Sequence, residues 1–284
     1  MSWLSKLLQT SHPVVRVLIY WFLSLLAGLA FTGMLLTPFL VSGQTRFAMW
    51  AGLCAIFLGF IAATFLAWLW YGDDAGSVTL GFKNHRWLKG VSGGLLSAGA
   101  VVLLVLLIYA AGLIQFGSFS PPTTAFYSVY TASVIFLTAA IEGLLLRGFP
   151  IQSMTRKPYP ESWLVVLSVV YVLLHSGNPG YFWLSYINIF LMGLWLSYAT
   201  LAAGTLWYSV GLHTGWNLSQ TLIFGYSGVW SDEALWSLFP VTVMGNSSWL
   251  AGNDSGIEGS VMTTILIILL ISYERTRWLR SLSS

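Results

Sequence analysis

The sequence has little charge. Only 7% of its 284 residues are Asp, Glu, Lys or Arg, whereas 57% are apolar and the mean hydropathy is +0.78. An ordinary soluble domain is about 25% charged. A chain of this composition cannot cover a water-facing surface, so soluble globular, disordered and fibrous proteins are excluded. An integral membrane protein with several spans remains, and the net charge of +3 is too small to indicate nucleic-acid binding.

Cysteine is almost absent as well. The one cysteine, Cys54, lies inside an apolar run, so the chain has neither a disulfide framework nor a cysteine metal site. No alternation of apolar and polar residues runs long enough to indicate a β-barrel.

Long apolar runs are what the sequence does have. Crossing about 30 Å of hydrocarbon takes about 20 helical residues, and eight ranges are candidates, of which the fifth and eighth are short: 14–41, 47–71, 88–114, 124–149, 163–175, 182–203, 205–226 and 259–273. The expected fold class is an all-α polytopic membrane protein with about eight transmembrane helices. Residues 1–284 form one transmembrane domain.

Basic residues predict how the chain crosses the membrane. With eight spans, Arg46 alone lies on one side, together with a loop, 227–258, that carries Asp232, Glu233, Asp254 and Glu258. The other side receives Lys6, Arg16, Lys83, Arg86, Lys89, Arg156, Lys157, Arg275, Arg277 and Arg280. The positive-inside rule therefore predicts that both termini are cytoplasmic and that loop 227–258 is extracytoplasmic. The expected location is a bacterial or archaeal plasma membrane.

Polar residues inside the apolar runs mark a candidate site, because a charge in hydrocarbon costs at least about 2.5 kcal/mol. They are Glu142 and Arg147 in the fourth range, His175 at the end of the fifth, and His213 and Asn217 in the seventh. At ~1.5 Å per residue, Glu142, His175 and His213 lie about 12, 18 and 14 Å from the cytoplasmic side, and Asn217 about 20 Å. Three segments thus bring polar groups into one layer.

Local spacing adds detail to this layer. His213 and Asn217 are four residues apart and share a helix face. Gly211 and Gly215 lie on roughly the opposite face, where they predict a close helix contact. Tyr171 and His175 also share a face, so the phenol can orient or cover the imidazole.

Each of these residues also has a structural interpretation. Glu142 can neutralise Arg147 or a histidine, His175 can be interfacial, and Asn217 can join helices by hydrogen bonds. Arg147 can extend its guanidinium to the membrane surface. To Asn188, in the sixth range, we assign the helix-joining role.

Three motifs in this region resemble those of the CPBP family, the intramembrane proteases related to CAAX prenyl endopeptidases and to bacteriocin-processing or Abi proteins. That family shows EExxxR on one span, FxxxH on the next, and HxxxN or HxxxD two spans later. The matching residues are Glu142-Gly143 with Arg147, Tyr171 with His175, and His213 with Asn217. The resemblance covers about residues 130–220, the motif core, and its order and intervals make it specific.

The resemblance implies an intramembrane endopeptidase that hydrolyses a peptide bond of a membrane-associated substrate, including prenylated CAAX-type substrates. Glu142 would activate water, His175 would hold and polarise it, and His213 and Asn217 would stabilise the oxyanion. Arg147 would orient the end of its helix or bind a substrate carboxylate. The expected partners are a membrane-embedded or membrane-associated peptide or protein and the lipid bilayer, with no nucleic acid.

Two residues depart from the family pattern. Tyr171 replaces Phe, which is a mild change. Gly143 replaces the second Glu, which in the family lies one helical turn before the arginine and can pair with it. Because the first Glu is present as Glu142, this departure bears on efficiency or substrate class before it bears on the chemistry.

Two alternatives use the same residues. In a metal version, Glu142, His175 and His213 would bind zinc with water as the fourth ligand, although the HExxH signature of zinc proteases is missing; we expect no cofactor and no metal. In a non-enzymatic version, Gly143 marks an inactive family member that acts as a membrane scaffold, chaperone or immunity protein. A transporter is disfavoured because no inverted halves are evident.

Overall fold

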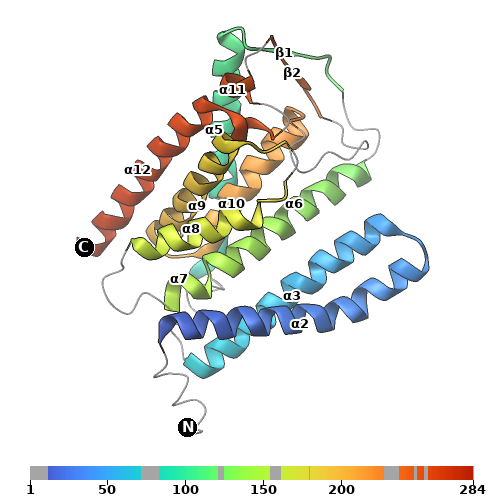
Figure 1. The fold of residues 1–284 in the computed structure, drawn as a ribbon, viewed down its shortest axis with the longest axis vertical. Coiled ribbons are helices and arrows are strands. Elements are labelled where there is room, and N and C mark those ends of the chain that lie inside the picture. Colours follow the sequence, from blue (N-terminus) through green and yellow to red (C-terminus); the bar gives the residue numbers. More distant parts are fainter. Residues whose placement is uncertain are drawn as a thin grey trace.

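The computed structural model describes residues 12–71, 83–120, 125–153, 161–178, 180–226, 237–245, 248–252 and 255–283. Its elements follow in chain order: α2 (Pro13–Val41), α3 (Thr45–Tyr71), η1 (Lys83–Leu88), α5 (Lys89–Ala110), β1 (Ile114–Phe116), α6 (Ala125–Leu146), α7 (Phe149–Ser153), α8 (Ser162–Leu174), α9 (Trp183–Ala203), α10 (Leu206–Leu218), η2 (Ser219–Ile223), β2 (Val241–Val243), α11 (Ser248–Ala251), η4 (Ile257–Gly259) and α12 (Val261–Ser283). Helices make up nearly all of it (Figure 1).

A helix lies in each of the eight apolar ranges, which confirms the predicted helical membrane fold. Among the described residues, five helical segments are long and apolar enough to cross a membrane: Pro13–Val41, Phe47–Trp70, Arg86–Ala110, Ala125–Ser153 and Trp183–Ala203. Helices α8 and α10 have 13 residues each, and α10 continues directly into a π-helical turn, η2. The number of eight spans and the cytoplasmic side of the termini stay predictions.

The third predicted span ends earlier than expected. The third range was expected to reach residue 114, but α5 ends at Ala110, and Gly112 turns the chain with a positive φ of 72°. Strand β1 then pairs antiparallel with β2, with Ile114 opposite Val243. Strands of three residues are too short to show as alternation in the sequence. In the fourth range α6 ends at Leu146, and α7 carries the apolar helical segment on to Ser153, beyond the expected end at residue 149.

The N-terminal helices α2 and α3 form a hairpin that lies beside α6 and α7 (Figure 1). Two side chains of α2 donate hydrogen bonds to the last turn of α6. The Tyr20 hydroxyl reaches the Leu144 carbonyl oxygen at 3.2 Å, and Trp21 Nε1 reaches the Leu145 carbonyl oxygen at 2.7 Å. The last carbonyls of a helix lack partners within it, so the hairpin stabilises the end of α6 just after Glu142.

Helix α10 packs closely on α5 through four glycines. A Cβ added at Gly211 would lie 1.9 Å from the Gly90 carbonyl oxygen, and one added at Gly215 would lie 2.2 Å from the Gly94 carbonyl oxygen. Only glycine permits backbones to approach this closely. The close helix contact predicted from Gly211 and Gly215 is therefore confirmed, with α5 as the partner.

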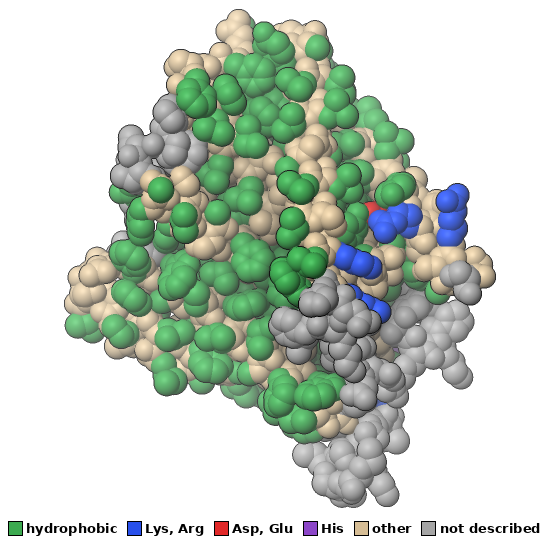
Figure 2. Space-filling model, turned by 180° about the vertical axis from the view of Figure 1, so that it is seen from behind, with side chains coloured by type: hydrophobic (Ala, Val, Ile, Leu, Met, Phe, Trp, Pro, Cys, Tyr) green, Lys and Arg blue, Asp and Glu red, His purple; other side chains and the backbone are tan. Residues whose placement is uncertain are grey.

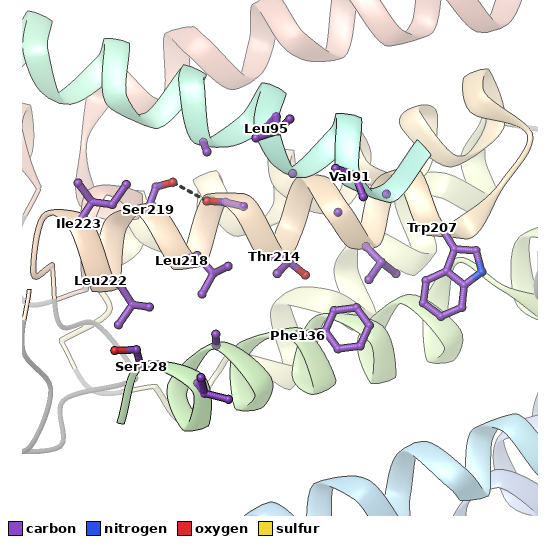
Figure 3. Close-up of a pocket in the computed structure, with 18 of the residues that line it drawn as sticks. Val91, Leu95, Ser128, Phe136, Trp207, Thr214, Leu218, Ser219, Leu222 and Ile223 are labelled. Atoms are coloured by element: carbon purple, nitrogen blue, oxygen red, sulfur yellow. Dashed lines mark hydrogen bonds between the residues drawn. The ribbon is translucent and has the colours of Figure 1, made fainter. Parts of the chain in front are cut away.

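Residues of α5, α6, α10 and η2 line a groove of about 970 Å³. In Figure 3, α10 lies between α5 and α6. The lining of the groove is apolar, with Val91 and Leu95 from α5 and Phe136 from α6. Three hydroxyl-bearing residues also line it: Ser128, Thr214 and Ser219. Ser128 Oγ and Thr214 Oγ1 have no hydrogen-bond partner in the described part of the chain. In Figure 3 the Thr214 side chain points from α10 toward α6.

The surface matches the low charge of the sequence. Hydrophobic side chains cover most of the face drawn in Figure 2, and the Lys and Arg side chains visible there gather in one region. This face therefore suits a lipid environment. Several charged residues used in the orientation prediction lie outside the described residues: Lys6, Arg156, Lys157, Asp232, Glu233 and Asp254.

Two basic side chains, one from η1 and one from the first residue of α5, contact the C-terminal end of α9. Arg86 Nη1 donates to the Gly204 carbonyl oxygen at 3.1 Å, and Lys89 Nζ donates to the Ala203 carbonyl oxygen at 2.8 Å. Cations at a helix C-terminus are favourable, because the unpaired carbonyls there carry partial negative charge. The start of α5 and the end of α9 therefore lie on the same side of the molecule, as the predicted crossing pattern requires.

Candidate active site

Three helices bring the four predicted catalytic residues to one cavity. Glu142 comes from α6, His175 from the residue that ends α8, and His213 and Asn217 from α10. All four line a cavity of about 220 Å³, and Tyr171 lines it too. The layer expected from residue counting along separate spans is thus a common cavity in the structure.

The carboxylate of Glu142 lies beside the imidazole of His213. Glu142 Oε2 and His213 Nδ1 are 3.7 Å apart, which is longer than a hydrogen bond. Neither atom has a hydrogen-bond partner among the described residues, although both are buried. A buried polar atom without a partner is costly. The pair is thus an arrangement that calls for a functional explanation.

The other ring nitrogen of His213 is fully engaged. Asn217 Nδ2 lies 3.1 Å from His213 Nε2, and the Tyr171 hydroxyl lies 3.4 Å from the same nitrogen. The i, i+4 spacing on α10 makes the first contact, as the sequence predicted. His213 is buried, with 3% of its surface exposed, so its orientation is set by these two neighbours and by Glu142.

His175 is held by the helix that it terminates. Its Nδ1 lies 2.9 Å from the Tyr171 carbonyl oxygen. A carbonyl oxygen only accepts, so Nδ1 carries the proton, and in the neutral ring Nε2 keeps its lone pair. The Tyr171 and His175 rings meet edge to face with centroids 4.5 Å apart. Tyr171 therefore covers and orients the His175 ring, as its position one turn earlier indicated.

Arg147 does not extend to the membrane surface. It follows the last residue of α6, and only 2% of its surface is exposed. Its guanidinium carbon lies 4.8 Å from the centroid of the Tyr171 ring, a cation–π contact. Within the described residues, Nε and Nη2 of Arg147 have no hydrogen-bond partner. Arg147 thus supports the site through Tyr171, and the surface position considered above is wrong.

Packing against α10 explains why residue 143 is a glycine in this chain. A Cβ at this position would lie 2.9 Å from Val210 Cγ2 and 3.2 Å from Leu206 Cδ1, both on α10. Position 143 therefore faces α10, and a larger residue there would require the Val210 or Leu206 side chain to shift. Glycine at this position lets α6 pack closely against these two side chains of α10.

Two residues that the motifs did not single out also line the cavity, Gln220 and Glu258. The sequence counted Glu258 among the charges of an extracytoplasmic loop, but the structure buries it, with 4% of its surface exposed. Its Oε1 accepts hydrogen bonds from Gln220 Nε2 at 2.7 Å and from Trp216 Nε1 at 2.9 Å. Burial raises the pKa of the Glu258 carboxyl, and these two hydrogen bonds act in the opposite direction.

A sequence signal existed for Gln220 but not for Glu258. Gln220 is three residues after Asn217 and seven after His213, which places all three on one helix face. Glu258 comes from η4, far along the chain, and no spacing connects it to α10. Asn188 has the structural role expected for it, since its Nδ2 donates to the Glu258 and Ser260 carbonyl oxygens at 2.7 and 2.9 Å.

The described part of the chain does not contain an assembled metal site. No group of three or more His, Cys, Asp or Glu side chains is placed there to hold a metal ion. The zinc set considered above, Glu142 with His175 and His213, lines the cavity without forming such a group.

Comparisons with known proteins support the interpretation of the motifs. Residues 124–219 match the family model described as type II CAAX prenyl endopeptidase Rce1-like. No curated protein and no solved structure matches the chain. The matched segment contains α6, α8, α9 and α10, and with them all four cavity residues predicted to be catalytic. The family resemblance indicated by the three motifs is therefore confirmed over residues 124–219, where the chain is similar to type II CAAX prenyl endopeptidases.

Proposed function

We propose that this protein is an intramembrane endopeptidase of the glutamate type, which hydrolyses a peptide bond of a membrane-associated substrate. One observation carries the proposal. Glu142 Oε2 lies 3.7 Å from His213 Nδ1, and neither atom has a hydrogen-bond partner among the described residues. The pair lies at a polar cavity inside the segment similar to a protease family. Perturbed, incompletely paired titratable groups in a cavity are typical of active sites.

Glu142 is the proposed base. Its carboxylate accepts a proton from a water molecule while the water oxygen attacks the carbonyl carbon of the scissile peptide. The protonated Glu142 then gives the proton to the leaving amine nitrogen, and the carbon–nitrogen bond breaks. His175 assists, because its Nε2 lone pair can accept a hydrogen bond from the same water and orient it.

His213 and Asn217 are the proposed donors to the oxyanion that forms on the peptide oxygen. A donor aimed at this developing charge commonly lowers the activation free energy by about 2.7–4 kcal/mol. Arg147 acts behind them, since its contact with the Tyr171 ring holds the phenol that reaches His213.

The cavity limits the form of the substrate. A volume of about 220 Å³ holds several water molecules, at roughly 30 Å³ each, or a short stretch of extended chain. A folded protein cannot enter it. The proposed substrate is therefore an extended peptide segment, prenylated or not, presented from the membrane. We place the enzyme in a bacterial or archaeal plasma membrane with both termini cytoplasmic.

The test is cleavage of quenched fluorescent peptides, prenylated and unprenylated, by the purified protein and by Glu142→Gln. Glutamine keeps the side-chain volume but cannot accept the proton, so cleavage should be lost while the thermal unfolding of the variant in detergent is unchanged. Full activity of Glu142→Gln would contradict the proposal.

Two further outcomes distinguish the alternatives. Loss of activity with a chelator and its recovery with zinc would favour the metal version, with Glu142, His175 and His213 as ligands. No cleavage of any peptide by folded wild-type protein would favour the inactive scaffold.

A further inference from the structure

Glu258 begins a chain of hydrogen bonds that ends at the proposed active site. Oε1 of Glu258 receives two N–H donors, from Trp216 and Gln220. Trp216 Nε1 only donates, so Oε1 of Glu258 accepts that hydrogen bond. The Ile257 amide N–H also only donates, and it meets Gln220 Oε1. The nitrogen of the Gln220 amide must therefore face Glu258, and the orientation of that amide is fixed.

The orientation of Gln220 fixes the next amide along the helix. Gln220 Nε2 also donates to Asn217 Oδ1 at 3.3 Å, while Gln220 Oε1 lies on the other side, 3.4 Å from the Ile257 amide nitrogen. Because Asn217 Oδ1 is the atom that meets a donor, Asn217 must turn its Nδ2 to the opposite side. There it lies 3.1 Å from His213 Nε2.

Asn217 in turn decides which nitrogen of His213 carries the proton. An amide nitrogen only donates, so His213 Nε2 must accept. The imidazole is then neutral with its proton on Nδ1, the nitrogen 3.7 Å from Glu142 Oε2. The opposite tautomer, or a doubly protonated ring, would set two donors against each other at Nε2.

We propose that Glu258 is a positioning residue that acts through Gln220 to fix the amide of Asn217 and the Nδ1-protonated tautomer of His213. The inference rests on the proposed function in one respect. If His213 and Asn217 stabilise an oxyanion, this relay supplies both donors, the Nδ1–H of His213 and the second amide hydrogen of Asn217. The tautomer itself follows from the hydrogen bonds whether or not the protein is a protease.

The first test measures the tautomer directly, by ¹⁵N nuclear magnetic resonance of histidine-labelled protein in detergent at neutral pH. Wild-type His213 should be protonated at Nδ1 only. In Gln220→Met, which keeps the side-chain length but removes both amide contacts, the Nε2-protonated form should appear. Thr263→Val is the matched control. It removes a buried hydrogen bond from α12 to the Ile257 carbonyl oxygen, next to Glu258, but none of the hydrogen bonds of the relay. Its His213 signals should match wild type.

A His213 ring protonated at Nε2 in wild type, or one that does not change in Gln220→Met, would overturn the relay. If Gln220→Met does not fold, Glu258→Met replaces it. Methionine at position 258 removes the oxygen that accepts from Gln220 Nε2, so the same change of tautomer is expected.

The second test is a double-mutant cycle on peptide cleavage. Gln220→Met should lower kcat on the order of tenfold with KM nearly unchanged, and it should have no further effect in an Asn217→Ala background. Equal losses in both backgrounds would show that Gln220 does not act through Asn217. If no peptide is cleaved at all, the proposed function fails, and the resonance measurement still decides the relay.

Discussion

Helix α10 lines the cavity on one side and the groove on the other. Its residues on the cavity side are polar, whereas those on the groove side are mostly small or apolar. On the cavity side, His213, Asn217 and Gln220 form a continuous chain of hydrogen bonds. On the groove side, two glycines contact α5, and the Thr214 hydroxyl has no partner among the described residues. Chemistry requires polar groups in fixed orientations, whereas a contact between two membrane helices requires small residues that let the backbones approach. Substitutions on the two sides should therefore affect different quantities.

The largest effect is expected on the cavity side, on the rate alone. Asn217→Ala removes one proposed oxyanion donor, so kcat for peptide cleavage should fall by about 10²–10³-fold. Thermal unfolding in detergent should change little, because Asn217 is only partly buried. A variant with more than half of the wild-type kcat would show that Asn217 only joins residues within the fold.

The next effect is expected on the α5 side, mainly on stability. Gly215→Val places a Cβ 2.2 Å from the Gly94 carbonyl oxygen, so the helices must separate, at a cost of about 2–3 kcal/mol. Gly94→Ala is the control, since its Cβ would meet only ordinary contact at 3.5 Å from the Gly211 carbonyl oxygen. Equal unfolding temperatures for the two variants would contradict the packing.

A third prediction concerns position 143, where α6 packs against α10 and where a glutamate would restore the family motif. Gly143→Glu should lower both stability and activity, because its Cβ would lie 2.9 Å from Val210 Cγ2 and overpacking typically costs about 1–3 kcal/mol. Gly99→Ala serves as the reference for a helical glycine, with no atom within 4 Å of its added Cβ. Higher cleavage activity in Gly143→Glu would mean that the missing carboxylate, and not packing, limits this protein.

A smaller effect is expected from the α2 hairpin, which supports the site from outside. Trp21→Phe keeps the ring but loses the 2.7 Å hydrogen bond to the Leu145 carbonyl oxygen. The free energy of unfolding should fall by about 1 kcal/mol, with a decrease in kcat if the end of α6 moves. An unchanged unfolding temperature would show that the carbonyl finds another donor.

The smallest effect is expected in the groove. Thr214→Val replaces a hydroxyl that has no partner within the described residues by a methyl group of similar shape. Stability should change by less than about 0.5 kcal/mol or increase slightly, and activity should be retained even though His213 is adjacent in sequence. A clear loss of activity would mean that the groove side takes part in catalysis.

Much of the candidate site could be predicted from the sequence because the protein lies in a membrane. Polar groups in apolar runs are costly, so Glu142, His175 and His213 stand out without any alignment, and a fixed helical rise gives their depth. The glycine contact of α10 was predictable for a related reason, since small residues four apart on a helix allow close packing.

The missed features depend on tertiary contacts that spacing does not reveal. Glu258 has the sequence context of a loop charge, and its burial follows only from how η4 meets α10. The two strands are too short to leave a pattern. Tyr20 and Trp21 look like ordinary interfacial aromatics, and their role becomes visible only when the end of α6 lies next to them.

The most direct test of the central claim, that Glu142 activates water, is a single turnover of a cleavable peptide in ¹⁸O-labelled water. Mass spectrometry should find one labelled oxygen in the new carboxyl terminus of the product and none in the Glu142 side chain, because the water oxygen bonds to the substrate while Glu142 only carries a proton. Label in the Glu142 carboxyl group, or a covalent peptide adduct there, would show that Glu142 attacks the substrate itself and would contradict the account.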